Sequence, residues 1–156
     1  MNVLLSEIVE ESIKLELNIS HLYNLFSVIF PEDTYFWEKL SAEEKNHASL
    51  IKTGKEVLLS CDEFPDEVLA PTLQEVIETN KKLLSMFKEF KDTPPSRKSA
   101  FKMAISLEES AGEIHFQYAM EKHPTSEYLK IFQNLCKDDK DHAQRIREYM
   151  NSSGIQ

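Results

Sequence analysis

Two short stretches of the sequence put an acid three residues before a histidine: 44-EKNH-47 and 139-DKDH-142. Residues three apart in an α-helix lie on the same face, so each pair can point in one direction. Carboxylate oxygens and imidazole nitrogens without a thiolate are ligands that suit iron or manganese. Glu44 with His47, and Asp139 with His142, are therefore the first candidates for metal ligation.

Two further acids stand where an apolar side chain is expected. On a helical wheel of about 100° per residue, Glu16 falls within the apolar arc of residues 2–30. Glu108 is central on the apolar face of residues 96–122. A buried carboxylate without a partner is costly or changes its protonation state. Inward-facing acids on four helices therefore indicate a shared site rather than isolated exceptions.

The elements that carry these residues have helical periodicity throughout, and no stretch alternates like a half-buried strand. Only 3 Gly and 6 Pro occur in 156 residues, which favours few turns and long elements. Breaks are expected at 31-PED-33, at 92-DTPPS-96 and at 123-HPT-125. The sequence predicts one all-α domain over residues 1–156, with five helices at about 2–30, 34–60, 71–90, 96–122 and 126–150.

The inward-facing acids of each predicted hairpin lie at similar distances from its turn. Glu16 and Glu44 each lie roughly 20 Å from the first hairpin turn at 1.5 Å per residue, and Glu108 and Asp139 lie about 23 Å from the second. The ligands should therefore meet in one layer of the bundle. A helix over 71–90 spans roughly 30 Å, enough to return the chain along the bundle. This predicts a four-helix bundle with one long crossover.

The composition and charge of the chain argue against some classes of binding partner. A net charge of −9 and a pI near 5.1 argue against nucleic acid or an anionic membrane surface as a partner. The N-terminal residues lack a signal-peptide pattern, and no apolar run approaches the roughly 20 residues of a membrane span. Cys61 and Cys136 have no ligand spacing. A cytoplasmic protein with reduced cysteines is expected.

The order Glu, ExxH, Glu, DxxH on four long helices resembles the ferritin-like di-iron carboxylate proteins, most closely the rubrerythrin and bacterioferritin branch. Glu16 with Tyr23 seven residues on, 44-EKNH-47, Glu108 and 139-DKDH-142 carry the resemblance, which covers nearly the whole chain. It implies a ferritin-like four-helix bundle whose long crossover, between the second and third bundle helices, contains an extra helix.

The resemblance also implies six ligands to two iron ions, or to manganese, four of them terminal and two bridging. The terminal pairs are Glu16 with His47 and Glu108 with His142, and the bridging residues are Glu44 and Asp139. Aspartate is one methylene shorter than the glutamate usual in the family, so Asp139 is the weak point of the second metal position.

Four more residues are expected around the ligands. Glu43 and Asp138 precede the bridging acids, and the family uses such acids to hydrogen-bond the histidine of the opposite helix. Tyr23 and His115 occupy matching positions near the metals, where His115 is expected to be a hydrogen-bonded core histidine rather than a ligand.

The function that the resemblance implies is the reduction of peroxide or dioxygen, with ferroxidase activity close behind. No rubredoxin-like CxxC pair is present. Electrons should therefore come from a separate donor protein, and a homodimer is expected. Two alternatives stay open: a metal-binding or structural bundle that acts through protein partners without redox turnover, and a di-iron oxygenase, which would need an apolar channel to its substrate.

Simpler structural roles also compete for each residue. Glu44 with His47 could be a buried polar pair, and Asp139 with His142 a solvated helix end. Glu109 is the main rival of Glu108 as the inward acid of its helix, and Glu113 is a lesser rival because it drifts outward on the wheel.

Overall fold

The computed structural model describes residues 3–137, 139 and 141–156. Over these residues the chain forms α-helices and 3-10 turns and no strand, which confirms the all-α class. The α-helices are α1 (Val3–Ile29), α2 (Thr34–Leu58), α3 (Leu73–Asp92), α4 (Arg97–Glu108), α5 (Ala111–Glu121), α6 (Glu127–Leu135) and α7 (His142–Ser152). The 3-10 turns are η1 (Pro31–Asp33), η2 (Leu59–Cys61) and η3 (Asp66–Val68).

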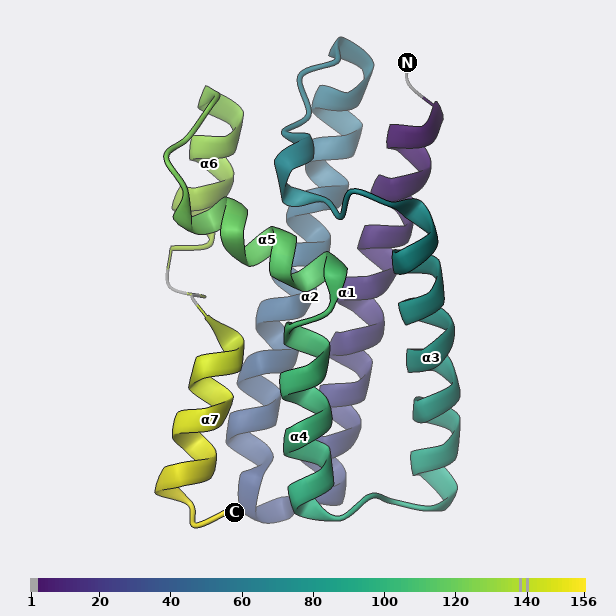
Figure 1. The fold of residues 1–156 in the computed structure, drawn as a ribbon, viewed down its shortest axis with the longest axis vertical. Coiled ribbons are helices and arrows are strands. Elements are labelled where there is room, and N and C mark those ends of the chain that lie inside the picture. Colours follow the sequence, from purple (N-terminus) through teal and green to yellow (C-terminus); the bar gives the residue numbers. More distant parts are fainter. Residues whose placement is uncertain (1–2, 138, 140) are drawn as a thin grey trace.

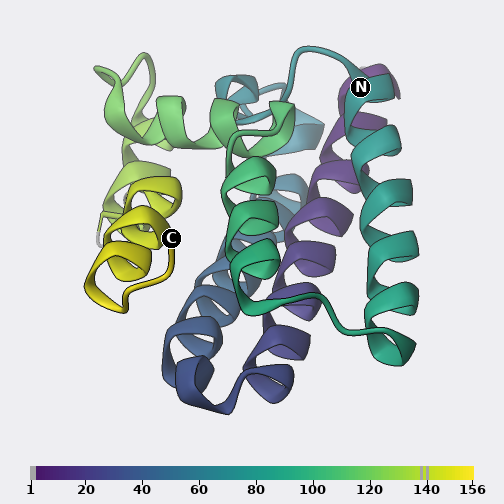
Figure 2. The same ribbon diagram turned by 60° about the horizontal axis from the view of Figure 1, so that its bottom comes forward.

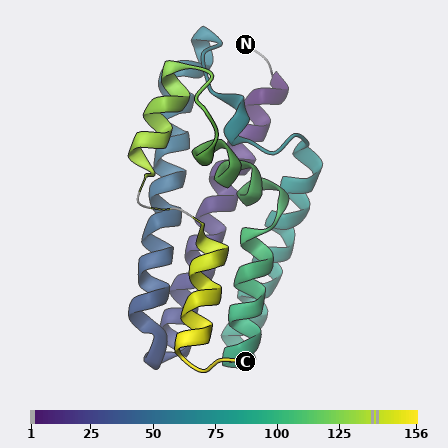
Figure 3. The ribbon, with the colours of Figure 1, turned by 60° about the vertical axis from the view of Figure 1, so that its left-hand side comes forward.

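Helices α1 and α2 form a long antiparallel hairpin, and α3 packs along α1 (Figure 1). Helix α3 carries the chain back along the bundle, so that α4 starts at the same end as α2 and runs parallel to it. Helix α7 packs beside α4 (Figure 3). The central layer of the molecule is therefore lined by α1, α2, α4 and α7, with α3 outside them.

The predicted fourth helix, 96–122, is wrong as a single element. It ends at Glu108, and α5 then crosses the bundle at a steep angle (Figure 2). Ser110 between them has an extended backbone, with φ −71° and ψ 160°. Gly112 follows, packed against α1, and an added Cβ there would clash with Cδ2 of Leu15. The missing side chain is what allows α5 to turn onto α1.

The predicted fifth helix, 126–150, is also wrong as a single element, because α6 and α7 are separated by residues 136–141. Aspartate side chains compete with the helical backbone for hydrogen bonds and favour caps. Asp141 has φ 45°, in the left-handed region, and its carboxylate accepts the backbone N–H of Gln144. The aspartate-rich segment therefore ends one helix and caps the next.

The apolar core has two parts, one on either side of a polar layer. The first surrounds Trp37 and the second surrounds Phe132. Along α2, Leu40 belongs to the first and Ile51 to the second, so Glu44 and His47 lie between them. No helix in the described part of the chain has the length and apolar character that a membrane crossing requires.

Candidate metal centre

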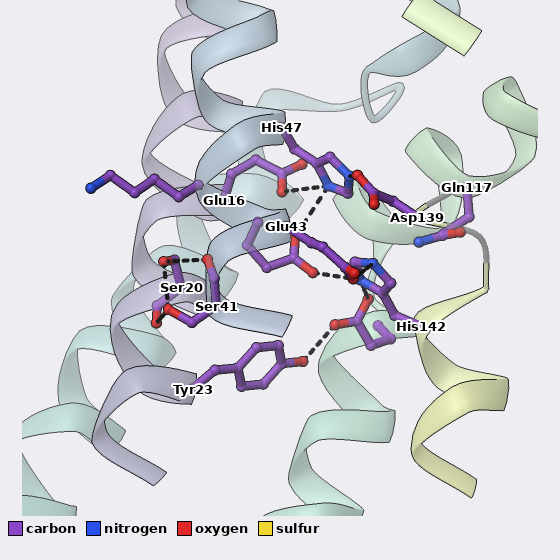
Figure 4. A network of polar contacts seen from close by, with 12 residues as sticks. Glu16, Ser20, Tyr23, Ser41, Glu43, His47, Gln117, Asp139 and His142 are labelled. Atoms are coloured by element: carbon purple, nitrogen blue, oxygen red, sulfur yellow. Dashed lines mark hydrogen bonds and ion pairs between the residues drawn. The ribbon is translucent and has the colours of Figure 1, made fainter. Parts of the chain in front are cut away.

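Five of the predicted ligand side chains converge in the polar layer, from four different helices (Figure 4). Each of them is at most 3% exposed: Glu16 on α1, Glu44 and His47 on α2, Glu108 on α4 and His142 on α7. They form two sets of three, and within each set the potential ligand atoms lie within 4.8 Å of one another. One set is Glu16, Glu44 and His47, and the other is Glu44, Glu108 and His142. Glu44 belongs to both.

The two imidazole rings point the same nitrogen into this layer. Nδ1 of His47 is 3.3 Å from Oε2 of Glu44 and 3.5 Å from Oε2 of Glu16. Nδ1 of His142 is 2.5 Å from Oε1 of Glu44 and 3.3 Å from Oε2 of Glu108. The rings are nearly parallel, with an interplanar angle of 9° and centroids 5.5 Å apart. The arrangement is close to symmetric about Glu44.

Glu43 holds the outer side of His142. Its Oε2 lies 3.0 Å from Nε2 of His142, and the Arg145 guanidinium donates two hydrogen bonds, of 2.6 and 3.1 Å, to the same carboxylate. A carboxylate on the far nitrogen fixes the tautomer and orientation of a ligating imidazole. Glu43 therefore makes the contact to the opposite helix that the resemblance implies.

Asp139 differs from its predicted bridging role. Its Oδ2 lies 3.4 Å from Nε2 of His47, on the outer side of that ring, and it groups there with the buried thiol of Cys136. The interruption of the helix is the reason, because Asp139 and His142 no longer share one helical face. Asp139 has the contact with His47 that was expected of Asp138, which lies outside the described residues.

Glu113 is a buried acid that the helical wheel turned outward. It is 0% exposed, and neither carboxyl oxygen has a hydrogen-bond partner among the described residues. Burial first, and then the charges of Glu16, Glu44 and Glu108, raise the pKa of Glu113 well above its ordinary value. Glu113 therefore lies close enough to these carboxylates to interact with them, although it belongs to neither set of three, and it arrives there because the chain turns between α4 and α5.

Tyr23 and His115 were both predicted to lie beside the candidate ligands, but only Tyr23 does. Tyr23 donates a 2.5 Å hydrogen bond from its hydroxyl to Oε1 of Glu108 (Figure 4). His115 instead lines a surface cavity with Ile8 and Asp66. Ile8 is eight residues from Glu16, about 12 Å along α1. The prediction that His115 supports the ligands is therefore not met, since α5 turns it away.

Several carboxyl oxygens in the polar layer are buried without hydrogen-bond partners among the described residues. Glu16, Glu44 and Glu108 each have a buried oxygen without a hydrogen-bond partner in the described structure. Burial raises the pKa of Glu16 to about 8. Burial, followed by the charge of Glu44, also raises the pKa of Glu108. Unpaired buried acids of this kind are ready to exchange protons for cations.

The negative charge of Glu44 and the positive charges of His47 and His142 stabilise one another. Burial opposes ionisation of Glu44, but the charges of His142 and His47 outweigh it and hold the pKa of Glu44 well below its ordinary value. Burial likewise opposes protonation of the histidines, but carboxylate contacts raise the pKa of both well above normal. Without a cation, protonated imidazoles therefore supply the positive charge that this layer of acids needs.

The donor set fits two divalent cations. Glu16, Glu44, Glu108 and Glu113 carry four negative charges when ionised, which equals the charge of two divalent ions. Orphaned carboxylate oxygens and inward Nδ1 atoms are the ligand atoms such ions would take. A cavity of about 160 Å³, lined by Glu108, Gln117 and Arg147 among others, leads from the surface to Glu108.

Known proteins give no further guide. The chain matches no family model, no curated protein and no solved structure. The arrangement of these side chains is therefore the basis for assigning a function.

Proposed function

We propose that this protein is a ferritin-like di-iron carboxylate oxidoreductase that reduces peroxide, or dioxygen, and also has ferroxidase activity. The single observation that supports this most is the pair of buried ligand sets that share Glu44. A carboxylate shared between two ligand sets suits a pair of adjacent metal ions. Glutamates from separate helices with inward-pointing histidines are the ligand pattern of ferritin-like carboxylate proteins.

In this proposal Glu16 and His47 would hold one ion and Glu108 and His142 would hold the other, with Glu44 belonging to both ligand sets. Glu113 supplies the fourth negative charge in place of Asp139. When bound, two ferrous ions supply the two electrons that convert one peroxide molecule into two waters. Glu43 and Asp139 orient the imidazoles from outside, and so both rings stay fixed while the charge at the centre changes.

The surrounding protein buries the centre and fixes its ligands. Tyr23 keeps one oxygen of Glu108 in place through its hydroxyl. Burial raises the pKa of Glu16 to about 8 in the metal-free protein, and Glu16 gives up this proton when it binds a cation. The two protons that peroxide reduction consumes therefore come from solvent, through the cavity beside Glu108.

The access cavity favours a small oxidant. Its volume of about 160 Å³ is well below the roughly 300–1,000 Å³ of pockets that take drug-sized ligands. Charged side chains, including Glu109, Glu121 and Arg147, line its wall. Peroxide and dioxygen can enter such a cavity, whereas the organic substrate of an oxygenase would need a larger and more apolar one. After each turnover, a separate donor protein returns two electrons to the metal centre.

Anaerobic metal binding tests the proposal. The metal-free protein is titrated with ferrous ion, the bound iron is counted, and peroxide is then added while the optical spectrum is recorded. We expect two iron ions per chain and a new absorption band after peroxide addition. Fewer than one iron or manganese ion per chain would overturn the proposal.

A second candidate is a metal-binding bundle that acts through protein partners without redox turnover. The position of Asp139 favours it, because this predicted bridging acid lies with Cys136 on the outer side of His47 rather than between the two ligand sets. This candidate predicts that metal binds with no spectral change on peroxide addition and that no peroxide is consumed.

A further inference from the structure

A chain of aromatic rings leads away from the candidate centre. Tyr23 lies 5.5 Å from Trp37, measured between ring centroids, and Trp37 lies 5.5 Å from Phe36 and 4.5 Å from Phe101. Phe36 and Phe101 both stack on Tyr149, at 4.0 and 5.6 Å. Two parallel routes therefore join Trp37 to Tyr149 through one intervening ring.

The chain begins at the centre and ends at the surface. Tyr23 is fully buried and is hydrogen-bonded to Glu108, a candidate ligand. Trp37 is also fully buried. Tyr149 is only half-buried and lines an open cavity of about 520 Å³ together with Asp33 and Lys39. Tyrosine and tryptophan are the aromatic side chains most easily oxidised, so the order of these rings matters.

The two oxidisable residues beyond Tyr23 differ in what can take their proton. The Tyr149 hydroxyl donates a 2.8 Å hydrogen bond to Oδ1 of Asp33, a buried carboxylate that also accepts two hydrogen bonds from Arg97. The indole N–H of Trp37 has no acceptor among the described residues. Oxidised Trp37 therefore keeps its proton and stays reactive. Oxidised Tyr149 can pass its proton to Asp33 and become a neutral radical.

We propose that Trp37 and Tyr149 form an electron relay through which the candidate metal centre draws electrons from the protein surface. Trp37 first gives an electron to the centre through Tyr23 and becomes oxidised. An electron then moves from Tyr149 to oxidised Trp37 across Phe36 or Phe101, and the phenol proton of Tyr149 moves to Asp33. The oxidant is peroxide, whose reduction to two waters takes two electrons and two protons.

The relay is needed when the centre is short of one electron. With a single ferrous ion bound, that ion supplies one electron and Tyr149 supplies the other, and the water protons come from solvent. The product is a radical on Tyr149, at the surface rather than among the ligands. This step rests on the proposed function for its oxidant, but the transfer between Trp37 and Tyr149 does not.

A flash experiment on the metal-free protein tests the relay alone. Near-ultraviolet light ionises Trp37, the one tryptophan of the chain, in a Tyr23→Phe background that removes the tyrosine packed directly on Trp37. We expect the tryptophan-radical absorption to decay as a tyrosyl band rises. Adding Tyr149→Phe should abolish the tyrosyl band and lengthen the tryptophan-radical lifetime. Equal decay with and without Tyr149 would overturn the relay.

Tyr128→Phe is the matched control. Tyr128 also interacts with a carboxylate, that of Glu63, which raises the pKa of its hydroxyl, and the residue is half-buried. It packs on the apolar cluster around Phe132, away from Trp37. The flash kinetics of Tyr23→Phe should not change when Tyr128→Phe is added. A change equal to that caused by Tyr149→Phe would also overturn the relay.

The second arm uses protein that holds one ferrous ion per chain. Peroxide is added, the sample is frozen rapidly, and the radical is detected by electron paramagnetic resonance. A tyrosyl signal that Tyr149→Phe removes and Tyr128→Phe retains supports the proposal. Consumption of peroxide with no Tyr149 signal overturns it. If iron does not bind while the flash transfer persists, the proposed function fails and the relay stands.

Discussion

Oε1 of Glu44 lies 2.5 Å from Nδ1 of His142, across the bundle from α2 to α7. The other oxygen of Glu44 is 3.3 Å from Nδ1 of His47 on its own helix. One carboxylate thus reaches both imidazoles, and neither of its oxygens has a well-formed hydrogen bond among the described residues. Both proposed metal positions depend on this residue.

Replacing Glu44 with glutamine should remove most metal binding at both positions. The amide has nearly the same size, but it cannot bring a negative charge to two cations. Bound iron should fall from two ions per chain to below one, as measured by anaerobic titration. Glu109→Gln is the control, because Glu109 is the exposed neighbour of Glu108. Full iron binding by Glu44→Gln would contradict the shared role of this residue.

Asp139 and Glu43 contact the outer nitrogens of the two histidines, and each should affect the binding of a different metal ion. Asp139→Asn weakens the hold on His47, and Glu43→Gln weakens the hold on His142. Each change should lower the affinity for one ion by roughly 10–100-fold and leave the other nearly unchanged. Isothermal titration with ferrous ion resolves the two affinities. Glu148→Gln, an exposed site on α7, should change neither.

Replacing Glu113 with glutamine should affect stability and metal affinity in opposite directions. The carboxyl group is fully buried without a hydrogen-bond partner among the described residues, so removing its charge should stabilise the metal-free protein at high pH, where the acid ionises, by about 1 kcal/mol or more. The same change removes one of four negative charges and should weaken metal binding. Thermal unfolding and iron titration measure the two effects, with Glu121→Gln as the exposed control. A loss of stability without a loss of affinity would argue against this role.

The metal-free protein should lose stability as the pH rises from 4.5 to about 8. Burial raises the pKa of Glu16 from 4.5 to about 8, so in this window the folded state holds a proton that the unfolded state has released. The raised pKa values of His47 and His142 act in the same direction, because their stabilisation is also lost as the pH rises. Glu16 alone should account for up to about 1.4 kcal/mol per pH unit.

Urea unfolding at a series of pH values checks this dependence. Glu16→Gln should flatten the profile, because glutamine does not titrate. Iron binding should release protons over the same pH range, since the ligands must lose them to bind the metal. A free energy of unfolding that rises between pH 4.5 and about 8 would show that the acids of the layer are not protonated as described.

Gly112 should be sensitive to the smallest substitution. In Gly112→Ala the new methyl group would meet Cδ2 of Leu15, which is fully buried and cannot move freely. We expect a loss of about 1–3 kcal/mol in unfolding free energy and weaker metal binding, because Glu113 is the next residue on α5. Combining it with Leu15→Ala should restore metal binding better than stability. Normal metal binding by Gly112→Ala alone would contradict this link.

Much of the candidate site could be predicted from residue types and periodicity. Glu16, Glu44 and Glu108 are charged residues in apolar stripes, and a helical wheel identifies them because burial of each stripe is a property of the local sequence. The spacing of His47 from Glu44 gives a shared face in the same way. These inferences hold because α1, α2 and α4 are continuous where the residues lie.

The tertiary structure decided the positions of Asp139, Glu113 and His115. Asp139 lies within an interruption that the periodicity did not reveal, and Glu113 and His115 follow one, so a wheel drawn across the break gives the wrong direction. Ser110 and Gly112 were the local signals for the first break and the aspartates around Asp139 for the second, but such residues also occur inside intact helices. The close approach of α5 to Leu15 is a contact between distant segments. The sequence determined which helices carry the candidate ligands, and only the packing of those helices decided which acids face the candidate centre.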